Sequence, residues 1–134
     1  MGVDLKLPDP LGPNVTLLEL DLTAEGALDR IVAELPNGTA NAVLSDAAPK
    51  LSGIADVDRA VGEELGQAAL ALALRVLPPE GFAVIKDFAG PGAQVLAREL
   101  KRVFHKVSEV RPEGRRAGSK ELYLLAQKLR KTKL

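Results

Sequence analysis

The stretch VLSDAAPKLSG, from Val43 to Gly53, decides the fold, because it ends a short apolar strand on a carboxylate and turns at once through a proline. Open α/β sheets place their chemistry at such points, outside the carboxyl ends of their strands. Two later runs bring charged residues that can join Asp46, namely Lys86 in GFAVIKDF and Glu121 in SKELYLLA. The sequence therefore predicts an α/β fold in which Lys86 and Glu121 can join Asp46.

Length and composition predict a single domain over residues 1–134, long enough to bury a core. The chain has no cysteine and one histidine, His105, so thiolate chemistry is excluded and a histidine triad or zinc site is nearly untenable. The N-terminus lacks a signal-peptide pattern, and the longest apolar stretch, Ala68 to Leu74, is too short to span a membrane. We expect a soluble, cytoplasmic protein.

The neutral net charge hides an uneven distribution. Residues 1–90 hold 6 Lys or Arg against 14 Asp or Glu, whereas residues 91–134 hold 12 against 4. A basic C-terminal third indicates a polyanionic partner, although a solvated surface ending in a frayed basic tail over 128–134 explains the charge equally well.

Strands and helices alternate along the first hundred residues, which favours a mostly parallel sheet with covering helices. We expect strands at Gly2–Leu5, Asn14–Leu20 and Ala42–Ser45, and a helix with Thr23 at its N-cap. A long helix is predicted from about Val57 to Leu77. The apolar face that periodicity assigns to this helix is Val57, Val61, Leu65, Ala68, Leu72 and Val76.

The remaining elements complete the sheet. Gly81–Phe88 is nearly all apolar and predicts a strand buried on both faces. A helix then follows the turn at residues 90–92, with Val95, Leu96, Leu100, Val103 and Phe104 as its buried stripe. Lys106–Arg111 and Lys120–Gln127 are strand-like runs, close enough in sequence to pair antiparallel.

These local sequences, from GVDLKLPDP through VLSDAAPKLSG and LPPEGFAVIKDF to VFHKVSEVRPEGRRAGSKELYLLA, resemble the FtsJ (RrmJ) family of RNA ribose 2′-O-methyltransferases. The family pattern S-D-x-A-P-x-x-S-G is specific when strands of the types V-K-x-F and S-x-E-x-Y follow it. The resemblance implies a Rossmann-like methyltransferase sheet, S-adenosylmethionine as cofactor, and a role in rRNA processing through RNA methylation.

The resemblance carries three members of the family's Lys-Asp-Lys-Glu catalytic set onto Asp46, Lys86 and Glu121. The first lysine and the family's glycine-rich cofactor loop lie in a part of the pattern that this sequence does not contain. We therefore expect an N-terminally truncated methyltransferase domain without its first strand. Lys86 would assist the ribose 2′ oxygen, either as a base or as an electrostatic stabiliser.

Cofactor and RNA contacts follow from the same resemblance. Asp4 matches the acidic residue near the cofactor ribose, Asp21 the one near the adenine, and Asp46 also borders the cofactor. The ribosomal RNA surface would be basic and bind phosphates without sequence choice. Its predicted members are Lys101, Arg102, Lys106, Arg111, Arg115, Arg116 and Lys120.

Two alternative functions differ in how well they fit the sequence. A degenerate, non-catalytic relative could act as an RNA-binding or scaffold module, which the basic C-terminal third also supports. An NAD-dependent dehydrogenase is improbable, because no G-x-G-x-x-G follows any strand. Whatever the function, an open sheet predicts self-association, through strand exchange for example.

Overall fold

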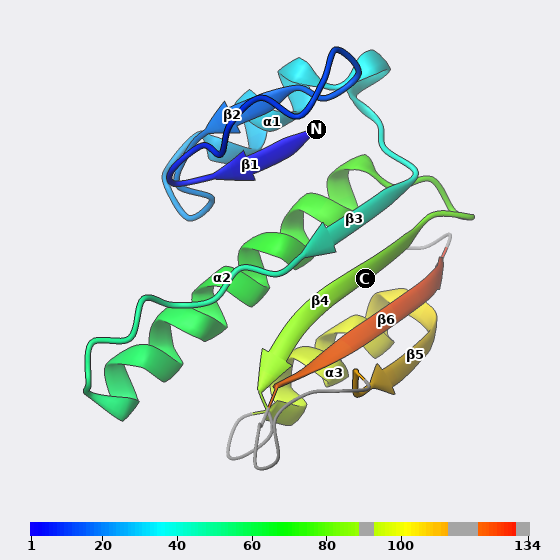
Figure 1. Ribbon diagram of the computed structural model, residues 1–134. Helices are drawn as coiled ribbons and strands as arrows, with labels where there is room; N and C mark the ends of the chain where they lie inside the picture. The colour runs from blue at the N-terminus through cyan, green and yellow to red at the C-terminus, as the bar shows by residue number, and fades with distance from the viewer. Residues whose placement is uncertain (89–92, 113–120, 131–134) are drawn as a thin grey trace.

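The computed structural model describes residues 1–88, 93–112 and 121–130, which form an α/β fold (Figure 1). The strands are β1 (Gly2–Asp4), β2 (Leu17–Glu19), β3 (Ala42–Ser45), β4 (Phe82–Phe88), β5 (Phe104–Val110) and β6 (Glu121–Leu129). The helices are α1 (Ala27–Glu34), the short 3-10 helix η1 (Pro36–Gly38), α2 (Ala55–Val76) and α3 (Ala93–Val103).

The strands form two sheets. β1 and β2 are a parallel pair, and the second sheet has the order β3-β4-β6-β5. In that sheet β3 and β4 are parallel, while β6 runs antiparallel to both β4 and β5. This confirms the predicted mix of parallel strands with a C-terminal antiparallel pair, and it places the last strand inside the sheet with β5 at its edge.

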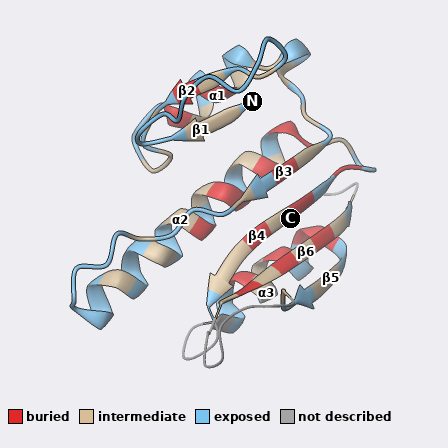
Figure 2. Cartoon of the chain, in the orientation of Figure 1, coloured by how far each residue is buried: buried red, intermediate tan, exposed pale blue. Residues whose placement is uncertain are grey.

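The core lies between one face of the second sheet and the helices α2 and α3 (Figure 2). Its strand residues alternate along the chain, as a half-buried pleated sheet requires. They come from all four strands of this sheet, β3, β4, β5 and β6. The buried strand residues are Val43, Ala83, Ile85, Phe104, Leu122, Leu124, Ala126 and Leu129.

The opposite face of this sheet is open along the described residues. Leu44 is 71% exposed, and Phe82 and Phe88 at the two ends of β4 are exposed as well. The prediction that β4 is buried on both faces was therefore wrong. The strand lies inside the sheet, but helices cover it on one side.

The predicted buried face of α2 was wrong in the first half of the helix, where Val57 and Val61 are exposed, and right toward its end, where Leu72 packs against the core and Val76 is buried. The buried residues of the helix are Gly66, Ala69, Leu70, Ala73 and Val76. At Gly66 the absence of a side chain lets the backbone of α2 lie close to Leu96 of α3. The stripe of α3 was largely right, since Leu96, Leu100 and Val103 are buried, although Val95 is exposed.

Smaller differences concern element ends. The helix α1 begins after Gly26, whose φ of 78° suits a residue without a Cβ, and Thr23 does not cap it. Instead Thr23 donates from both its backbone N and its Oγ1 to Asp21 Oδ1. The strand β2 is shorter than predicted. Lys128 and Leu129, which were predicted to lie in a basic tail, are the last residues of β6.

At the break between the two sheets, β1 and β3 each have one edge that pairs with no other strand among the described residues. Among the described residues β1 pairs with β2 alone, and β3 pairs with β4 alone. Figure 1 shows β1 and β3 running in the same direction on either side of the break. The carboxyl ends of β1, β2, β3 and β4 consequently lie along the same edge of the molecule.

Candidate active site

The three predicted catalytic residues meet at this edge. Asp46 directly follows β3, Lys86 lies near the carboxyl end of β4, and Glu121 is the first residue of β6. Because β6 is antiparallel to β4, its beginning lies beside the end of β4, with Lys86 paired to Tyr123 and Phe88 to Glu121. The topology alone therefore brings residues 75 positions apart in sequence to one place.

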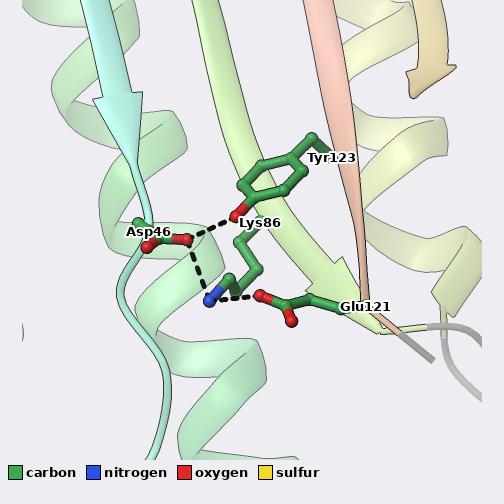
Figure 3. Close-up of polar contacts among 4 residues, drawn as sticks. All are labelled: Asp46, Lys86, Glu121 and Tyr123. Carbon is green, nitrogen blue, oxygen red and sulfur yellow. Dashed lines mark hydrogen bonds and ion pairs between the residues drawn. The ribbon is translucent and has the colours of Figure 1, made fainter. Parts of the chain in front are cut away.

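The side chains of these residues form an ion-paired cluster on the open face of the sheet (Figure 3). Lys86 Nζ lies 2.9 Å from Asp46 Oδ1 and 2.5 Å from Glu121 Oε1. The Lys86 side chain is 12% exposed, that of Glu121 35% and that of Asp46 73%. The amine is thus largely enclosed while the aspartate opens to solvent, where a substrate can reach it.

The pKa shifts show which forms these groups take. Burial lowers the pKa of Lys86, but its hydrogen bonds to Asp46 and Glu121 outweigh burial and raise that pKa overall. The hydrogen bond from Lys86, followed by that from Tyr123, lowers the pKa of Asp46. At neutral pH the cluster therefore holds an ammonium beside an ionised aspartate.

Tyr123 is a fourth member that the sequence analysis used only as part of a motif. Its hydroxyl donates to Asp46 Oδ1 over 2.7 Å, the same oxygen that accepts from Lys86. This hydrogen bond raises the pKa of Tyr123. The period of two along β6 was the available signal, because it places Tyr123 and Glu121 on one face.

The predicted cofactor carboxylates Asp4 and Asp21 lie at the ends of the other two parallel strands. Asp4 Oδ1 accepts from the backbone N of Leu5 over 2.7 Å. Asp21 Oδ1 accepts from Thr23, and these hydrogen bonds lower the pKa of Asp21. Both carboxylates are exposed, and these hydrogen bonds hold each of them through Oδ1.

The predicted RNA-binding residues do not lie on one surface. Arg111 follows β5 near the active-site edge, where its Nη2 lies 2.6 Å from Glu109 Oε1. Lys101 and Arg102 are in the last turn of α3, and Lys106 is in the first half of β5, all toward the other end of the sheet. Arg115, Arg116 and Lys120 lie outside the described residues.

Asp87, next to Lys86, points to the helix side of the sheet. It lines a small cleft between α2 and α3 together with Glu63 and Glu99, and its Oδ2 is buried without a hydrogen-bond partner among the described residues. Burial raises the pKa of Asp87, and the nearby Glu63 adds to the rise. Within the described residues no group of three or more acidic or histidine side chains is arranged to hold a metal ion.

Comparison with known proteins decides the family. Residues 1–129 match the model of the FtsJ-like methyltransferase family. The chain belongs to this family. Its Rossmann-like sheet and helices are also those of a solved structure described as a ribosomal RNA methyltransferase from Plasmodium falciparum, with a TM-score of 0.74 and 22% identity over 95% of this chain and 70% of that one.

Curated members of the family are closer in sequence. A ribosomal RNA large subunit methyltransferase E of Methanothrix thermoacetophila is 43% identical over 129 residues, which cover 96% of this chain and 50% of the relative. The enzyme of the same name from Pseudomonas fluorescens is 36% identical over 85% of this chain and 54% of the relative. The chain thus spans about half the length of these relatives. Along its described part, no helix combines the length and apolarity needed to cross a bilayer.

Proposed function

We propose that this chain carries the methyl-transfer site of a ribosomal RNA ribose 2′-O-methyltransferase that uses S-adenosylmethionine. The observation that carries the proposal is the Lys86 amine held between Asp46 and Glu121 at the carboxyl end of parallel strands. Ribosomal RNA is supported as the substrate because its relatives are named ribosomal RNA large subunit methyltransferase E. The proposal includes a cytoplasmic location, where ribosomal RNA is methylated during its processing.

The described carboxylates fit the cofactor. An adenosine offers hydroxyl and amine donors, and Asp4 and Asp21 offer exposed carboxylate acceptors at the ends of neighbouring strands, as in other nucleotide-binding sheets. Asp46 would border the methionine end from β3. When bound, S-adenosylmethionine supplies a sulfonium-linked methyl group that a hydroxyl oxygen can attack.

Lys86 would hold the attacking oxygen. A lysine ammonium has three N–H donors, and the contacts with Asp46 and Glu121 use two of them, which leaves one for the ribose 2′ oxygen. The raised pKa of Lys86 keeps this donor charged, so it stabilises the negative charge that develops on the oxygen as the hydroxyl proton leaves to water. Asp46 and Glu121 orient the ammonium, and Tyr123 holds Asp46 in place.

A methyl-transfer assay tests this proposal. Ribosomal RNA is incubated with the chain and a methyl-labelled donor, and 2′-O-methylated ribose is detected by its resistance to alkaline hydrolysis. We expect product with the unaltered chain and a loss on the order of a hundredfold in Lys86→Met, by analogy with removal of one preorganised donor. Lys50→Met is the matched control, since Lys50 is exposed and has no ion pair within the described residues. Equal product from Lys86→Met and Lys50→Met would refute the assignment.

One observation favours a second candidate, a non-catalytic RNA-binding module. The break between the sheets separates Asp4 and Asp21 from the strands that carry the catalytic cluster. This candidate predicts salt-sensitive RNA binding together with no affinity for S-adenosylmethionine. A measured cofactor affinity would remove it.

The same break motivates a proposal on assembly. Unpaired backbone groups along a strand edge favour pairing with another strand, and β1 and β3 both present such edges. We propose that two copies associate through these edges. Light scattering at working concentration should give a mass above that of one chain, and a monomer at all concentrations would contradict the proposal.

A further inference from the structure

Five cations gather at the end of the sheet that lies opposite the active-site edge. This end is built from the last turn of α3, the beginning of β5 and the end of β6, which Figure 1 shows together on one side. Backbone pairing holds the three segments together, since Phe104 pairs with Leu129 and the N of Arg130 donates to Val103 O over 2.8 Å. We call this group the distal basic surface. Its members are Lys101, Arg102, Lys106, Lys128 and Arg130.

The charge of this surface is not neutralised by the fold. Four of its members are exposed, and within the described residues none of the five forms an ion pair. Arg130 has a structural task, because its Nη2 donates to Lys101 O at the end of α3. On the adjoining segment Glu80 is an acidic neighbour, next to Pro79, whose carbonyl accepts from Leu129 N. Counted over the described residues of these segments, five cations stand against the one carboxylate of Glu80, so this end is positive.

The position of this surface relative to Lys86 can be worked out from the register. Lys106 pairs with Gln127, which pairs with Phe82, four residues before Lys86 in β4. At about 3.3 Å per residue along a strand and about 4.8 Å between strands, Lys106 is displaced from Lys86 by about 13 Å along the strands and about 10 Å across them, a separation of about 16 Å. The alternation along each strand also puts Lys106 and Lys86 on the same, open face. A long substrate can therefore contact both.

We propose that the distal basic surface is a second phosphate-binding site, which holds RNA about five nucleotides from the ribose at Lys86. The spacing follows from about 3.4 Å per stacked nucleotide along one strand. This inference rests on the proposed function for the position of the ribose. RNA fits better than an acidic protein, because repeated phosphates extending from a bound ribose supply charge at the distance where the cations lie.

RNA length provides the test. We would titrate the chain with an RNA of about four nucleotides and with one of about twenty, over a range of salt concentrations. In the triple variant Lys101→Ala, Arg102→Ala, Lys106→Ala, the salt slope for the long RNA should fall by about 2, since each single-strand phosphate contact contributes roughly 0.7. Binding of the short RNA should stay within about twofold. Arg130 is left unchanged because it supports α3.

The matched control removes the same charge from the acidic part of the chain through Lys6→Ala, Arg30→Ala and Lys50→Ala, three exposed cations without ion pairs among the described residues. Its long-RNA slope should not change. The proposal is overturned if the control loses as much slope as the triple variant, if both RNAs weaken equally, or if the unaltered chain binds neither RNA at low salt. Because binding is measured without cofactor, a failure of methyl transfer would leave this result standing.

Discussion

Replacing Lys86 by methionine tests the ion-paired cluster through stability alone. The substitution keeps the apolar part of the side chain and removes the amine that lies 2.9 Å from Asp46 and 2.5 Å from Glu121. Breaking a fully buried pair costs about 3–5 kcal/mol, and an exposed pair is worth about 0.2–1 kcal/mol. Lys86 is largely enclosed but both carboxylates are partly exposed, so we expect a loss of about 1–2 kcal/mol. For a chain of this size the melting temperature should fall by about 4–8 °C.

The pH dependence of this loss has a definite sign. Asp46 has a lowered pKa, so its contribution is present above its unfolded value and is lost as pH falls through the folded pKa. Lys86 has a raised pKa, so its contribution is complete below its unfolded value and is lost as pH rises through the folded pKa. The difference between Lys86→Met and the unaltered chain should hold from about pH 5 to 9 and shrink below about pH 4.

Thermal unfolding followed by circular dichroism measures both quantities. Lys50→Met serves as the matched control, with an expected change within about 0.5 kcal/mol. If Lys86→Met melts at the same temperature as Lys50→Met at pH 7, the cluster does not stabilise the fold and the reasoning fails.

Three further substitutions probe the surroundings of the site. Tyr123→Phe removes the donor to Asp46 Oδ1 and should cost about 0.5–1.5 kcal/mol in urea unfolding; an unchanged midpoint would show that the hydrogen bond contributes nothing. Asp87→Asn should stabilise the chain by a few tenths of a kcal/mol at pH 7, after allowance for partial exposure, because ionisation of this half-buried group is unfavourable; the gain should vanish below about pH 4, and a loss at pH 7 would contradict it. Gly81→Ala should cost about 1–3 kcal/mol, since its Cβ would lie 3.0 Å from Asn41 O and 3.0 Å from Leu77 Cδ2; a melting temperature equal to that of the unaltered chain would refute this steric reading.

The resemblance to the FtsJ family predicted the meeting of Asp46, Lys86 and Glu121, and strand direction explains why they meet. Asp46 and Lys86 follow parallel strands whose carboxyl ends share an edge, and an antiparallel β6 must begin where β4 ends. The sequence patterns predicted the pairing of β5 with β6 but not that of β6 with β4, which is the pairing that brings Glu121 beside Lys86. The role of Tyr123 was not predicted. Strand alternation places Tyr123 on the same face as Glu121, but it does not show that the Tyr123 hydroxyl donates to Asp46 Oδ1.

The buried face of α2 could not be read from periodicity. The helix is rich in alanine, so several faces are apolar, and the choice among them depends on how closely the backbone approaches the sheet. Gly66 instead lies against Leu96 of α3, and Ala73 is fully buried, while the larger Val57 and Val61 lie near the exposed beginning of the helix. The face of α2 that is buried is therefore determined by tertiary packing and not by the local sequence pattern.

The basic residues were misplaced for a related reason. Lys101, Arg102 and Arg111 are close in sequence, but β5 carries the chain from one end of the sheet to the other between them. Seven residues of strand span about 20 Å, so cations that look like one cluster fall on two separate surfaces. A net positive charge in a segment does not by itself define a surface.

Calorimetric titration of the chain with S-adenosylmethionine tests the central claim most directly, namely that these residues form a methyl-transfer site. The account predicts saturable binding that weakens at least about tenfold in Asp4→Ala, a loss of about 1.4 kcal/mol in binding free energy, and that is unchanged in Lys50→Met. Absence of any binding heat at millimolar cofactor, or equal affinity in all three proteins, would contradict it.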